Sequence, residues 1–419
     1  MNNLIQPLLI FIIAIAVILF FIKPQWVLYV FIASLPIEAL IDDSIFTLPK
    51  ILGFLALISF LVVVIKEKRK LHFDLPFFIM VLLVIWGSLS YFWSVSPDTT
   101  LVRITTLIQL LILYFLMINQ VRSIKNLDIL LKFLFLGTII FAFFGLSDLF
   151  LIVSGNQNMR LASVAGNANW YFIVSICLIP AGYWVYSTSK TKMIRFLTVL
   201  IILTLLITSL YTQSRGGLIS LTVFFLSILL FSKNKFSWVF IITIIAFVIY
   251  QFLPEGYLLR FGDIFYDSRI TRLWPAGLRA FHDKLLTGHG LGTNGYVITK
   301  YLGVNYLNYF ASVHNAFLGI GIEIGVLGLL LYILFIFIPI GKLTMLINIK
   351  NNKNMHIIRN FIIVQISVLF AYLTSWIKGG GLEYQKMLWF IVGIVSVLTI
   401  ILQKEVQSKN NSVAMDNKL

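Results

Sequence analysis

The chain has 419 residues, of which 60% are hydrophobic and only 11% are charged, and its mean hydropathy is +0.97. Soluble domains have nearer half apolar and a quarter charged residues, so a soluble globular fold is excluded and lipid must surround most of the chain. Lysine and arginine number 32 against 16 acidic residues. This excess lies in short loops between apolar runs, which predicts membrane topology and contact with anionic lipids, and no binding of nucleic acid.

Apolar runs predict an all-α, polytopic membrane protein of about 12–13 transmembrane helices, because a helix needs about 20 apolar residues to cross a bilayer. We expect one integral membrane domain over 1–406 and a short cytoplasmic tail over 407–419. The segment near 25–41 is the weakest, because Pro36 and Glu38 interrupt it. The predicted spans lie near 4–22, 25–41, 47–65, 75–94, 101–118, 129–153, 169–186, 196–213, 215–231, 237–253, 313–341, 357–376 and 387–402.

Basic residues predict the orientation of these spans, because loops rich in lysine and arginine stay in the cytoplasm. Clusters at 66–70, 190–195 and 342–359 place those loops and the C-terminus inside. The N-terminus lies outside if segment 25–41 crosses, and inside if it does not. One large extracytoplasmic loop, about 254–312, contains short amphipathic helices, and the spacing of its apolar residues predicts one over 270–286, along the membrane interface.

Arginine and lysine are distributed differently on this topology. Of the 11 arginines seven lie outside, whereas 16 lysines lie inside and five outside. Topology needs only positive charge, so arginine on the disfavoured side needs another reason, and its rigid fork suits phosphate. The outer arginines are Arg103, Arg160, Arg215, Arg260, Arg269, Arg272 and Arg279.

The segment 213–217, Gln-Ser-Arg-Gly-Gly, lies at the outer boundary between two apolar runs. Arg215 there is costly unless it snorkels or binds an anion. Ser214 is a candidate helix cap, and Gly216 permits close approach of a ligand. A tight turn with a snorkelling arginine is the alternative.

Arg269 and Arg272 lie three residues apart, so on an α-helix they share a face. Gly288 and Gly290 follow in a Gly-His-Gly-Leu-Gly run that permits a tight loop. A solvated amphipathic helix with a flexible end is the alternative interpretation.

His314 and Asn315 open a glycine-studded span at its outer end. A histidine there can be neutral and accept a proton near physiological pH, so His314 is a candidate general base. The alternative is an interfacial histidine without a catalytic role. Asp148 and Glu323 lie within apolar runs, where a charge suggests a function, although the sequence names no partner for either.

Carboxylates Glu38, Asp42 and Asp43 fall in the first outer loop, where they could bind a divalent metal or simply be solvated. The single cysteine, Cys177, lies in an apolar run and excludes a disulfide framework and a thiolate metal site.

Several of these motifs, in this order, resemble the O-antigen ligase and O-antigen polymerase superfamily of bacterial membrane glycosyltransferases. The resemblance is strongest over 155–340 and rests on Ser214-Arg215-Gly216, on Arg272-Leu273-Trp274 leading to Thr287-Gly288-His289-Gly290-Leu291-Gly292, on His314-Asn315, and on Met159-Arg160-Leu161 before Asn167-Ala168-Asn169. The chain departs from the family pattern at Ala168, where proline is common, and at His289, where a small or apolar residue is usual.

The resemblance implies a donor glycan on undecaprenyl diphosphate, presented at the outer face of the bacterial cytoplasmic membrane, and transfer to a sugar hydroxyl without a cofactor or metal. The acceptor is a lipid A core sugar in a ligase or another lipid-linked repeat unit in a polymerase; the modest outer loop leans towards polymerase. On this resemblance, we expect His314 to act as the general base. The residues expected to bind the diphosphate are Arg215, Arg272, Arg269 and Arg160, and those expected to support the site are Ser214, Gly216, Asn315, Gly288 and Gly290.

Two rival functions stay open from the sequence. A metal-dependent lipid-phosphate glycosyltransferase would use the first outer loop. A transporter of lipid-linked glycans would need polar residues near the midplane of two related halves, and the charges here concentrate at one face.

Overall fold

A computed structural model of the chain describes residues 2–40, 47–155, 160–233, 235–251, 269–303, 311–347, 355–379, 381 and 384–416. Every regular element in these ranges is a helix, so the all-α prediction is confirmed. The helices are α1 Asn2–Ile22, α2 Val27–Ser34, α3 Leu48–Glu67, α4 Leu75–Leu89, α5 Pro97–Gln120, α6 Ile124–Gly155, α7 Ala168–Thr188, α8 Lys192–Leu210, α9 Arg215–Phe231, α10 Lys235–Gln251, α12 Trp274–Asp283, α13 Asn294–Tyr301, α14 Ala316–Ile347, α15 Met355–Trp376 and α16 Lys386–Asp416.

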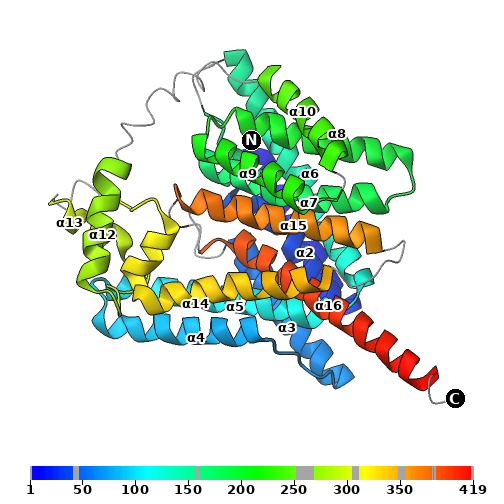
Figure 1. Cartoon of the computed structure of the whole chain (residues 1–419), viewed down its shortest axis with the longest axis horizontal. Helices are drawn as coiled ribbons and strands as arrows, with labels where there is room; N and C mark the ends of the chain where they lie inside the picture. Colours follow the sequence, from blue (N-terminus) through cyan, green and yellow to red (C-terminus); the bar gives the residue numbers. More distant parts are fainter. Residues whose placement is uncertain are drawn as a thin grey trace.

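The protein is a multi-pass membrane protein. Nine helices of the described ranges are long and apolar enough to cross a bilayer, and three shorter apolar helices, Pro7–Ile22, Arg215–Phe231 and Lys235–Ile244, accompany them. The predicted total of about 12–13 spans therefore stays a prediction beyond these nine. In Figure 1 the long helices lie side by side, with α12 and α13 beyond one end of the bundle and the C-terminus at the other. The helix α16 continues to Asp416, so most of the predicted tail is helical.

The weakest predicted span, 25–41, is a short helix between two tighter 3₁₀ turns, Pro24–Trp26 and Leu35–Leu40. With eight residues, α2 is about 12 Å long and too short to cross alone. It is nevertheless buried, and α6 packs directly on its backbone: a Cβ at Gly137 would lie 2.0 Å from the carbonyl oxygen of Ala33. The absent side chain therefore lets two helices approach closely, as membrane helices commonly do.

The helix α7 and the part of α16 up to Leu402 form the centre of the bundle and are mostly buried. Both are apolar on all sides, as a helix surrounded by other helices must be. The helices α3, α4 and α8 expose many large apolar side chains, Phe54 and Phe78 among them. Such surfaces suit lipid and would be unfavourable in water.

The predicted amphipathic helix over 270–286 is confirmed as a π-helical turn, Arg269–Leu273, followed by α12. Its buried face packs against α13 and the start of α14, and together they form a second apolar cluster. The buried members of that cluster are Leu273, Ala280, Val297, Ile298, Ala311, Val313 and Ile322. The position of α12 along the membrane interface stays a prediction.

The helix α14 contains a break near its N-terminal end. The backbone leaves the helical conformation at Ile324 and Gly325, and Gly325 has φ +69°. A break in a membrane helix exposes polar backbone groups that lipid cannot satisfy. Here protein satisfies them: His289 N donates to Ile322 O at 2.9 Å, and Gly290 N donates to Glu323 O at 2.8 Å.

Two further hydrogen bonds complete this seal. Trp86 Nε1 donates to Ile324 O at 2.8 Å, and Val326 N donates to Leu285 O at 2.8 Å. The loop 284–293, which we call the glycine loop, therefore replaces the hydrogen bonds that the break removes.

We predict that Gly325→Ala destabilises the protein by about 1–3 kcal/mol, because alanine is strained at positive φ and its Cβ would lie 2.1 Å from Leu286 O. Thermal unfolding of the purified protein in detergent measures this loss. The matched control is Gly341→Ala in the same helix, where a Cβ meets nothing within 4 Å. Equal unfolding midpoints for the two variants would contradict the prediction.

Candidate active site

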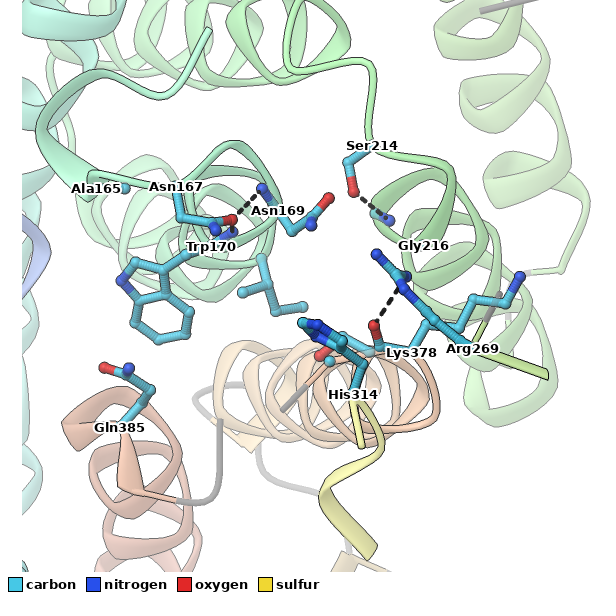
Figure 2. Close-up of a pocket in the computed structure, with 14 residues that line it drawn as sticks. Ala165, Asn167, Asn169, Trp170, Ser214, Gly216, Arg269, His314, Lys378 and Gln385 are labelled. Carbon is cyan, nitrogen blue, oxygen red and sulfur yellow. Dashed lines mark hydrogen bonds between the residues drawn. The ribbon is translucent and has the colours of Figure 1, made fainter. Parts of the chain in front are cut away.

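Four helices begin around one cavity of about 270 Å³ (Figure 2). Asn167 precedes α7, Ser214 precedes α9, His314 precedes α14 and Gln385 precedes α16. Helix N-termini carry partial positive charge and unpaired N–H groups, so their convergence favours an anionic ligand. The cavity is lined by Ala165, Asn167, Asn169, Trp170, Ile173, Ser214, Gly216, Gly217, Arg269, His314, Ser375, Lys378, Gly379 and Gln385.

The start of α9 is built as the sequence predicts, with Ser214 as its cap. The buried Ser214 Oγ accepts a hydrogen bond from Gly217 N at 3.1 Å. The two glycines that follow have different roles. A Cβ at Gly217 would lie 2.3 Å from Phe172, so Gly217 lets α9 pack on α7, whereas Gly216 meets only Lys378 Cβ at 3.9 Å and leaves the cavity open.

The start of α7 is tied to the turn before α9 by Arg160. Asn167 Oδ1 caps α7, accepting from Asn169 N at 2.8 Å and Trp170 N at 3.3 Å. Arg160 Nε donates to Thr212 O at 2.8 Å, and its Nη2 donates to Asn169 Oδ1 at 3.2 Å. Arg160 thus joins the start of α7 to Thr212, which lies in the turn before α9 and 52 residues after Arg160 in the sequence.

Positive charge gathers in a smaller cavity of about 60 Å³ beside the first. It is lined by Arg160, Asn169, Gln213, Arg215, Gly216, Arg269 and Lys378. Arg269 belongs to both cavities, and its Nη1 donates to Lys378 O at 3.2 Å (Figure 2). Three of the four predicted diphosphate-binding arginines therefore meet at one place, where forked donors can bind phosphate oxygens.

Arg272, the fourth, is exposed and does not line either cavity. The reason is the π-helical turn at Arg269–Leu273. A π turn holds more residues than an α turn, so side chains three apart diverge around its axis and do not share a face. Its proposed contact with diphosphate stays a prediction.

His314 lies between the cationic residues and α7, with its ring directed into the cavity (Figure 2). Its backbone has φ +50°, a conformation that L-residues rarely adopt without a compensating constraint. The constraint comes from its neighbours: Val313 is fully buried, and Asn315 Oδ1 caps α14 by accepting from Leu318 N at 3.0 Å. Asn315 therefore shapes the loop, as a supporting residue would.

Sequence reasoning missed the residues that complete the cavity. Trp170 and Gln385 lie on the side away from Arg269 and Lys378 (Figure 2). This side has neutral amide and indole groups, whereas the opposite side is cationic. Lys378 had a usable signal, because it directly follows an apolar span and precedes a run of three glycines.

Gly288 and Gly290 do not line this cavity. A Cβ at Gly288 would lie 2.3 Å from Glu323 O, and one at Gly290 would lie 2.3 Å from Ser94 Oγ. The lack of a side chain at Gly288 lets the glycine loop lie against α14, and at Gly290 it lets the loop lie against Ser94; their role as supporting residues of the site stays a prediction.

The metal-binding alternative rested on Glu38, Asp42 and Asp43 in the predicted first outer loop. Glu38 forms an ion pair with Lys386 at the start of α16, while Asp42 and Asp43 lie outside the described residues. Within the described part of the chain, no group of three histidine, cysteine or acidic residues is placed to hold a metal ion.

Residues 196–333 match the family model for O-antigen ligase. This part of the chain, about a third of its length, is similar to the O-antigen ligase and polymerase superfamily. The resemblance inferred from the motifs is therefore confirmed, and it supports a ligase or polymerase role in the synthesis of surface polysaccharide. No curated protein matches the chain.

The matched segment contains Ser214, Arg215, Arg269 and His314, but it does not contain all the residues that line the two cavities. Arg160 and Trp170 precede it, and Lys378 and Gln385 follow it. The cavities are thus completed by residues that come before and after the matched segment in the sequence.

His289, where the family usually has a small residue, joins the glycine loop to α12. Its ring is buried, and Nε2 donates to Ala280 O at 2.9 Å. Burial lowers the pKa of His289 below its usual value, and the hydrogen bond to Ala280 offsets only part of this effect.

Because its folded-state pKa is depressed, neutral His289 stabilises the fold above the unfolded pKa of about 6.5, and this stability is lost on acidification. We predict that the unfolding midpoint falls more between pH 7.5 and 5.5 in the native protein than in His289→Gln, which cannot titrate. His282→Gln, an exposed position on α12, is the control and should retain the native pH dependence. Identical pH dependence in all three proteins would contradict this role.

Proposed function

We propose that this protein transfers an oligosaccharide from undecaprenyl diphosphate to a sugar hydroxyl, at the outer face of a bacterial cytoplasmic membrane. The observation that carries the proposal is that His314 and a cluster of arginines line two adjoining cavities. The two cavities share Arg269, Lys378, Gly216 and Asn169. A base beside a diphosphate site is what this transfer requires.

The cationic side suits the diphosphate of the donor. Arg160, Arg215, Arg269 and Lys378 line the smaller cavity, and the N-termini of α7 and α9 add partial positive charge. When the glycosidic bond breaks, negative charge develops on the phosphate oxygen that leaves. Donors already arranged around that oxygen stabilise the transition state without reorganising.

The neutral side suits a sugar. Trp170 is half-buried and offers an apolar face, and Asn167 and Gln385 offer amide donors and acceptors. Sugar rings combine apolar C–H faces with hydroxyl groups, so an aromatic surface flanked by amides matches both. The donor would then lie across the site, with its glycan near Trp170 and its diphosphate near Arg215.

His314 lies between these two sides and is proposed as the general base. Its neutral ring accepts the proton of the acceptor hydroxyl while that oxygen attacks the anomeric carbon. The bond from the anomeric carbon to the phosphate oxygen breaks, and the lipid diphosphate leaves with the electron pair. The donor supplies its own activation, so the reaction needs no nucleotide outside the cell.

The distribution of charge supports the outer location. The cavity residues come from loops that the basic residues predict to be extracytoplasmic, whereas the clusters at 66–70 and 190–195 belong to loops predicted in the cytoplasm. The acceptor, a lipid A core sugar or a second lipid-linked repeat unit, distinguishes a ligase from a polymerase.

We predict that His314→Ala lowers the rate of glycan transfer by about 10²–10⁴-fold, the usual contribution of a positioned base, without changing the unfolding midpoint. The assay uses proteoliposomes with purified lipid-linked donor and gel analysis of product length. The control is His282→Ala on the exposed side of α12, which should retain activity. Normal product from His314→Ala would refute the assignment.

The same assay separates the remaining alternatives. A ladder of products without added core acceptor identifies a polymerase, and product only with acceptor identifies a ligase. Activity that survives EDTA agrees with the proposed metal-free reaction, whereas loss on chelation would favour the metal-dependent alternative.

We predict that Arg215→Lys lowers transfer by about 10–100-fold, somewhat less than the loss of a full oxyanion donor, because lysine keeps the charge but loses the fork. Arg279→Lys is the matched control: Arg279 is exposed on α12, and its Nη2 donates only a long bond of 3.4 Å to Tyr301 O. Equal activity of both variants would show that positive charge alone suffices at residue 215.

A further inference from the structure

Glu323 is a buried acid that the proposed reaction does not use. Its side chain lies in α14, next to the break, and the residue is only 1% exposed. An ionised side chain inside a membrane protein is costly unless its acceptors are satisfied, and such residues generally have a function.

Four donors satisfy the two carboxylate oxygens. Oε2 accepts from Gly292 N at 2.8 Å and from the hydroxyl of Tyr384. Oε1 accepts from Asn294 Nδ2 at 2.8 Å and, more weakly, from Asn294 N at 3.4 Å. Glu323 thus fixes both the backbone and the amide of Asn294 in one orientation.

Asn294 in turn holds the loop that presents His314. With its Nδ2 committed to Glu323, its Oδ1 faces the loop and accepts from Ser312 Oγ at 3.2 Å and Val313 N at 3.3 Å. His314 N then donates to Ser312 Oγ at 3.4 Å. A continuous chain of hydrogen bonds therefore connects the carboxylate of Glu323 to the backbone of His314.

We infer that Glu323 is a positioning residue for His314, acting through Asn294; this inference rests on the proposed role of His314 as base. Only a carboxylate accepts on both oxygens. In glutamine one oxygen becomes an NH₂ group that would face N–H donors, and Asn294 would lose its fixed orientation. Arg160 is bonded to α7 and to the turn before α9, and Arg215 begins α9, so these two arginines do not depend on this chain of bonds.

The experiment compares kcat and the KM for donor in proteoliposomes for two variants. We expect Glu323→Gln and Asn294→Ser each to lower kcat at least about tenfold, since misplacing a catalytic group by 1 Å can cost about 10²-fold. The KM for donor should change less than about threefold. The double variant should lose no more than the more severe single variant, because both changes break one chain of hydrogen bonds.

Asp128→Asn is the control for a merely structural acid. Asp128 likewise accepts from an aromatic side chain, Trp184 Nε1 at 2.9 Å, and from Lys132 Nζ at 2.7 Å, but it belongs to a separate network of α6 and α7. Loss of the Asp128 carboxylate should lower the unfolding midpoint and leave the ratio of kcat to KM unchanged. If Glu323→Gln does not fold, Asn294→Ser carries the test, because it leaves the bonds of Glu323 to Gly292 and Tyr384 in place.

Unchanged kcat in the folded variants, or a KM that rises as much as kcat falls, would overturn the inference. That failure differs from failure of the proposed function. If the function is wrong, the native protein makes no product or His314→Ala retains activity; if only the inference is wrong, His314→Ala is inactive while Glu323→Gln and Asn294→Ser are normal.

Discussion

The break in α14 at Ile324 and Gly325 is the constraint on which the end of the protein that carries α12 and α13 depends (Figure 1). The freed carbonyl groups must find donors within protein, and the glycine loop supplies them at Ile322 and Glu323. This requirement fixes the loop, and α12 and α13 are then fixed by packing against it and against α14. A local backbone irregularity thereby sets the position of a whole layer of short helices.

The cavity follows from helix geometry as much as from individual side chains. Four helices begin at its wall, so partial positive charges converge there before any arginine contributes. Arg160, Arg215 and Arg269 add full charges on one side, whereas Trp170 and Gln385 keep the other side neutral. This division gives an extended ligand only one orientation in which charge meets charge, and it leaves His314 near the boundary.

Sequence patterns predicted the membrane helices well, because hydropathy depends on local composition. The cap at Ser214 and the amphipathic helix before Asp283 were equally local and are confirmed. Prediction failed where distance in sequence decides the outcome. Glu323 had no nameable partner, because Asn294 and Tyr384 lie 29 and 61 residues away, and Lys378 and Gln385 reach the cavity only through the packing of α15 and α16. The π-helical turn that directs Arg269 and Arg272 to different sides could not be predicted, because a single such turn does not change the spacing of the apolar residues around it.

The central position of α16 has a consequence for biosynthesis. It follows all the other helices of the described residues, yet its part up to Leu402 is mostly buried among them, and its start brings Gln385 to the cavity. The preceding helices enter the membrane before their core exists, and they must wait for α16 to replace lipid with protein contacts. The cavity is therefore completed only after α16 has been synthesised, so a nascent chain that still lacks this helix has no assembled cavity.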